Sequence, residues 1–257
     1  MLCINNTHTD PFFNAAAEEY FLKESPENIL MLYRNEPSVI IGKYQDVQYE
    51  VNIEFVERNN IKVVRRYSGG GAVFHDLGNL NISFIESNNN NLNFNRFTNT
   101  MIDMLSGLGL KVKSNNRKAL TINGYKISGS AQGIYKGRVI YHATLLFSSN
   151  LANLIASLDG NDLTDINTKP SRLSVRSVKS PVSNIIDHIK FNMDIIDFRN
   201  LIMNYFLSRS NCNIPYTFSE KDVNGILNLK DYKYSTSEWV NHGSVPFSKR
   251  EVKSAFC

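Results

Sequence analysis

The sequence predicts an α/β fold of the α+β type, with a mixed, largely antiparallel sheet and helices flanking it. Three features lead to this prediction. Short apolar runs of strand length fill the first two thirds of the chain. Many of them come in neighbouring pairs separated by turn signals, which is typical of antiparallel strands. Amphipathic segments of helical length lie between and after them, without the regular alternation that a doubly wound parallel sheet requires.

The first helix is predicted to begin after residue 10. Asp10 is a favourable N-cap, and Pro11 suits the first helical position. In the residues that follow, one helical face collects apolar side chains. These are Phe13, Ala16, Ala17, Tyr20 and Phe21.

Strands dominate the region that follows. They are expected at residues 29–34, 38–44, 61–66, 72–76 and 80–85. Asn35-Glu36-Pro37 is a turn signal between the first two, and Leu77-Gly78-Asn79 separates the last two. A short helix is expected at residues 53–60, before the strand that leads into three consecutive glycines.

The second half contains a hairpin and three helices. Asn88 to Asn91 is a tract typical of a solvated loop. Apolar residues then keep helical spacing from Phe94 to Leu108, until Gly107 and Gly109 end the helix. Residues 119–131 form a hairpin candidate with Asn123-Gly124 as its turn. The remaining elements are a strand at 138–147, helices at 150–158 and 193–207, and a polar tail with the single Trp239.

Composition limits the class of protein. The 257 residues are 42% hydrophobic and 20% charged, with a net charge of +4. This fits one globular domain over residues 1–257 and an acidic or phosphate-bearing partner better than nucleic acid. The three cysteines have neither metal nor redox spacing, and no membrane span or targeting segment is apparent. A cytoplasmic enzyme is therefore expected.

The stretch RRYSGGGAVFHDLGN raises the first question of function. Gly69, Gly70 and Gly71 lack the Lys of a Walker loop, and the strand-like residues after them do not fit a dinucleotide fingerprint. Two interpretations remain open. One is a glycine turn that brings bare backbone against a flat or anionic ligand, and the other is a tight hairpin with a basic rim. Because successive strand residues face opposite ways, one of Arg65 and Arg66 should face the ligand and the other solvent.

A second stretch, KISGSA, starts at Lys126. A single lysine is usually solvent-facing. Here it is followed by Ser-Gly-Ser-Ala, whose small side chains leave room for a ligand beside the ammonium group. This pattern favours an anion site over a hairpin with a basic rim.

Together these motifs resemble the lipoate–protein ligase family. DPFFNAAAEEYFL is similar to the family's opening helix, and YRNEPSVIIGKYQDVQYEVN to its Gly-x-x-Gln-Asn segment. YHATLLF, SVRSVKSPVSNI and SEWVNHG are similar to later family segments. The resemblance extends over about residues 10 to 247 and rests most on the triple-glycine and lysine motifs.

The resemblance implies a fold, a reaction and its partners. The fold is the catalytic domain shared with biotin protein ligases and class II aminoacyl-tRNA synthetases. The reaction uses lipoate and Mg²⁺-ATP to make lipoyl-AMP, and then transfers the lipoyl group to a lysine of a lipoyl domain. The expected acceptors are the E2 subunits of 2-oxoacid dehydrogenases and the glycine-cleavage H protein, without nucleic acid or membrane.

The resemblance also implies the site residues. Lys126 is expected to contact the acyl carbonyl and phosphate as the catalytic group. The nucleotide or adenylate is expected to bind at Arg66, Ser68, Gly69, Gly70, Gly71, Ala72, Val73 and Phe74. Supporting positions are His75, Asn81, Gly129, Ser130, Ala131 and His142.

Several of these expectations carry alternatives. His75 is expected to hold the glycine loop by a hydrogen bond, and His142 either faces the acyl site or packs. Asp46 stands where the family usually has Asn, in a segment expected to line the pocket. An apolar tunnel for the lipoyl chain is expected, with candidate lining residues Val39, Ile41, Val73, Ile82 and Phe84.

The sequence ends soon after the Trp-containing segment, without the accessory domain that many lipoate ligases carry. Three options stay open: a separate accessory subunit, adenylation without one, or transfer from ready-made lipoyl-AMP. A related octanoyltransferase would need a cysteine near Lys126, and the segment before that lysine has none. A non-catalytic carrier of lipoate or its adenylate is the alternative from another class.

Overall fold

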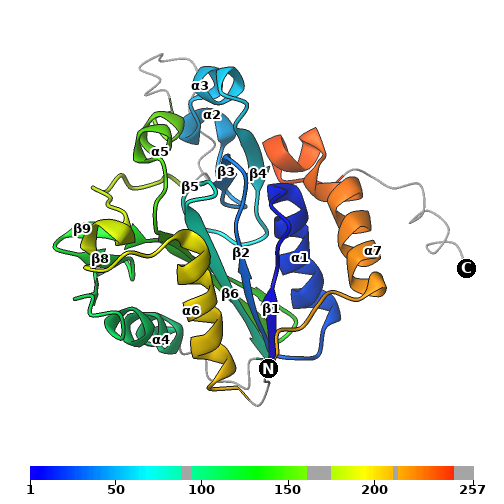
Figure 1. Cartoon of the computed structure of the whole chain (residues 1–257). Coiled ribbons are helices and arrows are strands. Elements are labelled where there is room, and N and C mark those ends of the chain that lie inside the picture. Colours follow the sequence, from blue (N-terminus) through cyan, green and yellow to red (C-terminus); the bar gives the residue numbers. More distant parts are fainter. Residues whose placement is uncertain (88–93, 161–174, 211–213, 246–257) are drawn as a thin grey trace, which may run out of the picture.

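The computed structural model describes residues 1–87, 94–160, 175–210 and 214–245. Three sheets form the framework (Figure 1). The largest has the order β1-β2-β6-β11-β10 and is parallel only between β1 and β2. The mixed, largely antiparallel sheet that the sequence predicts is thus confirmed. Its strands are β1 (Leu2–Asn5), β2 (Ile29–Tyr33), β6 (Asn79–Ser87), β10 (Ser130–Tyr135) and β11 (Arg138–Leu146).

Two smaller sheets complete the strands. The order β4-β3-β5 combines β3 (Ser38–Ile41), β4 (Lys62–Arg65) and β5 (Val73–His75). The order β7-β8-β9 combines β7 (Lys113–Ser114), β8 (Leu120–Ile122) and β9 (Tyr125–Ser128). Asn123 and Gly124 have φ values of 51° and 86°, as the predicted two-residue hairpin turn requires.

The predicted strand pairs are only partly hairpins. β8 pairs with β9, and β10 pairs with β11. In contrast, β2 and β3 belong to different sheets although only four residues separate them, and so do β5 and β6. β2 is buried at every position, so it lies at the centre of its sheet between β1 and β6 and needs no partner from β3.

Helices cover both faces of the large sheet (Figure 1). α1 (Pro11–Glu24) and α7 (Glu220–Leu229) pack on one face, while α4 (Asn95–Ser106) and α6 (Ile195–Leu207) pack on the other. Strand alternation supplies both cores: Leu30 and Leu32 face α4 and α6, whereas Ile29 and Met31 face α1. The Asp10 side chain accepts a hydrogen bond from the backbone N–H of Phe12, so the predicted N-cap is confirmed.

Shorter helices cover the small β4-β3-β5 sheet. They are α2 (Val47–Glu50), α3 (Ile53–Arg58) and α5 (Leu151–Ser157). A 3₁₀ turn, η1 (Ile185–His188), and two π-helical turns, η2 (Lys230–Tyr234) and η3 (Glu238–His242), follow later in the chain. The polar tail predicted from the sequence therefore carries helical structure, with Trp239 buried against β4. The predicted loop at 88–91 lies outside the described residues.

None of the helices within the described ranges is long and apolar enough to cross a membrane.

Candidate active site

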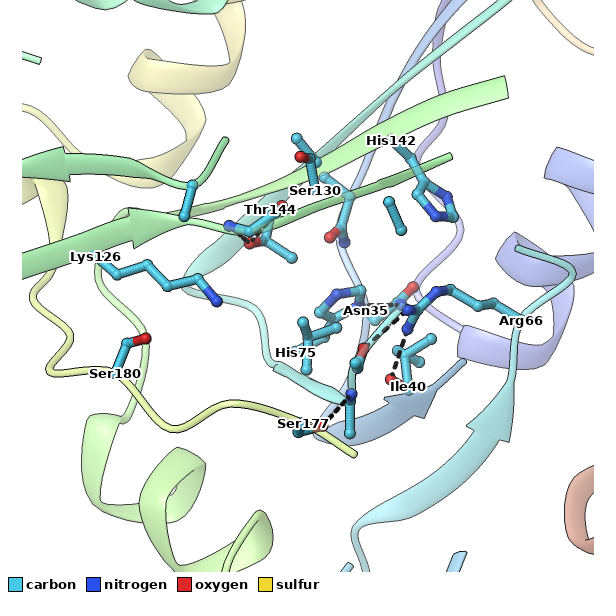
Figure 2. Close-up of a pocket in the computed structure, with 18 of the residues that line it drawn as sticks. Asn35, Ile40, Arg66, His75, Lys126, Ser130, His142, Thr144, Ser177 and Ser180 are labelled. Carbon is cyan, nitrogen blue, oxygen red and sulfur yellow. Dashed lines mark hydrogen bonds between the residues drawn. The ribbon is translucent and has the colours of Figure 1, made fainter. Parts of the chain in front are cut away.

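A cavity with about 1130 Å³ of empty space, including its open mouth, lies where the large and small sheets meet (Figure 2). The lining residues come from α1, β2, β3, the glycine loop, β5, β6, β9, β10 and β11 and from adjoining loops. Arg176, Ser177, Val178 and Ser180 complete the lining. The charged groups that face it are Glu18, Arg66, Arg117, Lys126 and Arg176.

The glycine loop is fixed by Arg66, which follows β4 and is 5% exposed. Its Nη2 donates to the carbonyl oxygens of Gly69 (2.6 Å) and Gly71 (2.8 Å), and its Nη1 to that of Ile40 (3.0 Å). Gly70 sits inside this clamp with φ at 89°, and a Cβ there would lie 2.9 Å from Nη2 of Arg66. The loop needs glycine at position 70 because both the backbone angle and the space exclude a side chain.

Among the described residues, no carboxylate lies within ion-pair distance of Arg66, so its charge is not neutralised by a direct partner. Burial lowers its pKa to about 10. The guanidinium is therefore still charged at neutral pH. The carbonyl oxygens satisfy its hydrogen bonds, and its positive field reaches the cavity that it lines.

The expectation that the other arginine faces solvent is wrong. Arg65 is 1% exposed and donates to the backbone carbonyls of two loops. Its Nη1 reaches Gly42, Lys43 and Gln45, while Nε and Nη2 reach the C-terminal turn at residues 239–241. These carbonyl groups take the place of the water that an exposed arginine would bind. Arg65 therefore connects the C-terminal turn at residues 239–241 to the loop at residues 42–45.

The segment that follows residue 174 binds the C-terminal end of the glycine loop. Ser177 Oγ accepts hydrogen bonds from the backbone N–H of Ala72 (2.7 Å) and from Gln45 Nε2 (3.0 Å). The backbone N–H of Ser177 donates to the Glu50 carboxylate. Asp46, which departs from the family pattern, does not line the cavity; its side chain caps α2 by accepting from Gln48 N.

Lys126 enters the cavity from β9. Its Nζ makes no hydrogen bond or ion pair with the residues that the structure describes. Burial, with a further contribution from Arg117, lowers the pKa of Lys126 below its ordinary value. A Cβ on Gly129 would lie 3.1 Å from this Nζ, so the small residue beside the ammonium is required for its position. An unpaired, partly desolvated cation is suited to bind an anion.

A buried hydrogen-bonded chain lies on the opposite wall. His142 Nε2 is 2.7 Å from Ser68 Oγ, and its Nδ1 is 2.9 Å from a Glu18 carboxylate oxygen. Burial alone would raise the pKa of Glu18. The charge of His142 and hydrogen bonds from His142, Ser83 and Tyr33 outweigh burial and lower that pKa instead. Because Ser68 does not line the cavity and also bonds to Arg66, this chain orients the loop arginine.

His75 does not hold the glycine loop as expected. It is buried, and its Nδ1 lies 2.9 Å from Asn35 Nδ2, on the turn after β2. Its Nε2 has no partner among the described residues, and the ring lines the cavity. Burial and the nearby charge of Arg66 lower the pKa of His75 to about 3, so the ring is neutral at physiological pH.

Most of the predicted site residues meet around this one cavity. The lining includes Arg66, Gly71, Ala72, Val73, His75, Asn81, Lys126, Gly129, Ser130, Ala131 and His142. The structure thus places the glycine motif and the lysine motif around one cavity. Of the two alternatives for His142, the structure shows that its side chain lines this cavity. Four predicted residues do not line it: Ser68, Gly69, Gly70 and Phe74. The first three belong to the loop that Arg66 contacts, and Phe74 packs in the core beside β3.

The predicted tunnel lining is wrong except for Val73. Val39 and Ile41 pack in the core around the small sheet, and Ile82 and Phe84 pack against α4 and α6. Strand alternation explains the error, since neighbouring residues face opposite sides. On β3 the residue that lines the cavity is Ile40, and on β6 it is Asn81.

Several lining residues were missed in the sequence. The most informative are Glu18, Tyr33, Asn35 and Ser177. Glu18 lies off the apolar face that the spacing predicts for the first helix, so no local pattern marks it as buried. Ser177 lay in the quoted SVRSVKS segment but had no spacing that would place it against the glycine loop.

The cavity suits a phosphate better than a protein-held metal. No group of three or more His, Cys, Asp or Glu side chains gathers as a metal site in the part of the chain that the structure describes. Glu18 is already engaged by His142. A divalent ion here would depend mainly on ligand phosphates and water, which is how Mg²⁺ usually enters nucleotide sites.

Comparison with known proteins points to one family. Residues 10–207 match the family model described as the lipoyl protein ligase A/B catalytic domain. Lipoate-protein ligase LplJ of Bacillus subtilis is 37% identical over 253 residues, which cover 96% of this chain and 75% of that protein.

Three solved structures are also similar. A putative lipoate protein ligase of T. acidophilum with bound lipoic acid has a TM-score of 0.77 at 27% identity, covering 95% of this chain and 99% of that one. A bi-partite ligase of Thermoplasma acidophilum, described with its E2 lipoyl domain, has a TM-score of 0.77 at 29% identity, covering 93% and 95%. A lipoate-protein ligase A bound with ATP has a TM-score of 0.76 at 27% identity, covering 93% and 97%.

Proposed function

Because the chain belongs to the lipoyl protein ligase A/B catalytic-domain family, we propose that it is an ATP-dependent lipoate–protein ligase. In this proposal it converts lipoate and ATP to lipoyl-AMP and pyrophosphate, and then acylates a lysine of a lipoyl domain. The observation that carries the proposal is the Lys126 ammonium, which has no partner in the described part of the chain and faces the same cavity as Gly71 of the glycine loop. Similar solved proteins are described with lipoic acid and with ATP bound.

The first step joins two anions. The lipoate carboxylate must attack the α-phosphate of ATP, and their mutual repulsion raises the barrier. Lys126 and Arg66 both bring positive charge to the cavity, which offsets the repulsion and stabilises the charge that grows in the transition state. Mg²⁺ bound with ATP would add Lewis-acid stabilisation of the phosphates.

The second step needs a neutral amine and a stabilised oxyanion. As the acceptor lysine attacks the mixed anhydride, the carbonyl oxygen gains negative charge that the Lys126 ammonium can hold. The positive field of Lys126 and Arg66 also disfavours the protonated form of the incoming amine. The attacking nitrogen gives up one proton, to the departing AMP phosphate or to solvent, as the amide forms, and AMP leaves as an anion. This scheme requires no covalent nucleophile on the enzyme.

A thiolate mechanism has no support at this cavity. Cys3, the only cysteine within the described residues, is buried in β1 and packs against α6, away from the cavity lining. Cys212 and Cys257 lie outside the described residues. The acyl group is therefore proposed to pass directly from the adenylate to the acceptor amine.

The acceptor is proposed to be an acidic lipoyl domain, of a 2-oxoacid dehydrogenase E2 subunit or of the glycine-cleavage H protein. The net charge of +4 favours encounter with such a partner. The archaeal ligase described as bi-partite motivates a second candidate: that this catalytic domain uses lipoyl-AMP and relies on a separate accessory subunit for adenylation.

A mass measurement tests the proposal and separates the two candidates. The purified chain is mixed with an apo lipoyl domain and either lipoate with Mg²⁺-ATP or synthetic lipoyl-AMP. A lipoyl mass increase in both mixtures supports the complete ligase. An increase only with lipoyl-AMP supports the transferase with a separate subunit, and tight lipoyl-AMP binding without transfer would contradict both in favour of a carrier.

A further inference from the structure

His75 presents an unused hydrogen-bonding atom to the cavity. The side chain is 5% exposed, and its Nε2 has no partner among the described residues. A buried polar atom without a partner is energetically costly, so such an atom beside a ligand cavity suggests that the ligand satisfies it. Whether Nε2 donates or accepts a hydrogen bond depends on which ring nitrogen carries the proton.

A chain of three asparagines fixes that proton. Asn6 Oδ1 accepts from the backbone N–H of His8 (3.0 Å), so Asn6 must turn its Nδ2 toward Asn14 Oδ1 (2.7 Å). Asn14 Nδ2 then donates to Asn35 Oδ1 (2.7 Å), and Asn35 Nδ2 to His75 Nδ1 (2.9 Å). Because the first donor is a backbone N–H, which cannot be reversed, the direction of the whole chain is set.

The second asparagine is anchored independently. Asn14 Nδ2 also lies 2.8 Å from the backbone carbonyl oxygen of His8. A carbonyl oxygen can only accept, so this contact requires the same orientation of the Asn14 amide. His75 Nδ1 is therefore an acceptor, and in the neutral ring Nε2 carries the hydrogen.

The surroundings keep the ring neutral. His75 shares the cavity with Lys126 and Arg66, and in the view of Figure 2 its ring lies between the ends of those two side chains. Burial and the charge of Arg66 disfavour a positive charge on the ring and outweigh the attraction of the Glu18 carboxylate. Together with the hydrogen bond that Nδ1 accepts from Asn35, these effects exclude a role as a general base. The group available to a ligand is a neutral N–H.

We propose that the Nε2–H of neutral His75 donates a hydrogen bond to an oxygen of the acyl-phosphate group of the bound acyl-adenylate. This inference rests on the function proposed above. The flanking cations attract the acyl-phosphate, while a neutral donor of fixed direction selects one position of its oxygen without adding charge. The proton stays on Nε2 throughout, so His75 positions the group that Lys126 activates.

The first test reads the tautomer without any ligand. Nitrogen-15 NMR of the histidine rings of the wild-type chain should show His75 protonated at Nε2 and unchanged between pH 5 and 9, the window implied by its strongly lowered pKa. Asn35→Asp replaces the donor with an acceptor and should move the proton to Nδ1. An Nδ1–H ring in the wild-type chain would overturn the inference.

The second test measures binding of a non-hydrolysable probe, lipoyl-sulfamoyl-adenosine, by calorimetry. His75→Phe and Asn35→Asp should each weaken binding about 10-fold, the loss expected for one well-placed hydrogen bond. His242→Phe, the same change at an exposed histidine, should leave the affinity unchanged. In the wild-type complex, the His75 Nε2–H signal should shift downfield and exchange more slowly with water.

The outcomes separate the two proposals. Wild-type affinity in a folded His75→Phe variant and in Asn35→Asp would overturn the role of His75 while leaving the ligase function intact. Failure of the wild-type chain to bind the probe, with the predicted tautomer present, would refute the proposed function and with it the assigned ligand.

Discussion

Replacing Gly129 with alanine should separate catalysis from stability. The φ angle of Gly129 is not positive, so its backbone accepts an L-residue. The only close obstacles to a Cβ are Nζ and Cε of Lys126, at 3.1 and 3.2 Å, and the next atom, Thr144 Oγ1, is 3.9 Å away. The end of a lysine chain can move aside. The substitution should therefore displace the ammonium and leave the fold intact.

The expected magnitudes follow from these contacts. A Gly→Ala change at a compatible backbone stabilises by about 0.4–1 kcal/mol, because it restricts the unfolded chain. A displacement approaching 1 Å at a catalytic group costs up to about 100-fold in rate, so the smaller shift expected here should lower transfer by about 10- to 100-fold. Urea unfolding measures the change in stability, and transfer of lipoyl from synthetic lipoyl-AMP measures the change in rate.

Gly107→Ala is the matched control. Gly107 has helical angles at the end of α4 and does not line the cavity, so alanine should change stability slightly and transfer not at all. Undiminished transfer by a folded Gly129→Ala variant would refute the claim that the ammonium position matters. A loss of stability above about 1 kcal/mol would show that Lys126 cannot move aside.

Four further outcomes are expected. The transfer rate should fall as pH rises through the lowered pKa of Lys126, since the charged form is active; Lys126→Arg, which stays charged, should lose that alkaline decline in any activity it retains. Lys233→Met should destabilise by about 3 kcal/mol in urea unfolding, because Lys233 Nζ lies 2.5 Å from the buried Glu19 carboxylate; an accompanying Glu19→Gln should recover part of the loss. Gly70→Ala should lower the free energy of unfolding by about 1–2 kcal/mol or more, because alanine is strained in its left-handed backbone conformation. Gly69→Ala should change it by less than about 0.5 kcal/mol, because the nearest atom to the added Cβ, on Tyr44, is 3.8 Å away. Equal effects of the two variants would contradict the loop geometry. Transfer to an acidic lipoyl domain should slow as salt rises, and a rate indifferent to ionic strength would exclude electrostatic docking.

Local signals predicted much of the fold because they depend on near neighbours. Asp10 caps α1 and the Asn123-Gly124 turn closes β8 onto β9, as their residue types imply. Pairing between distant strands has no such signal. The sequence between β2 and β3 looks like a hairpin turn, yet the two strands pair in different sheets.

The site was predictable as a set of motifs but not as a set of contacts. Periodicity marks Val39, Ile40 and Ile41 as one apolar run, and only the orientation of β3 in its sheet decides that Ile40 faces the cavity. Arg65 and Arg66 are both basic in the sequence. That both are buried depends on carbonyl groups supplied by chain segments up to about 176 residues away, which no local pattern reveals.

The central claim is that the Lys126 ammonium stabilises the negative charge of acyl transfer, and single-turnover transfer from lipoyl-AMP tests it most directly. Lys126→Gln keeps most of the side-chain volume and removes the charge. The variant should fold, and its transfer rate should fall by about 100- to 1000-fold, as when an oxyanion donor is removed. A Lys126→Gln variant that transfers lipoyl at a rate near that of the wild-type chain would contradict the account.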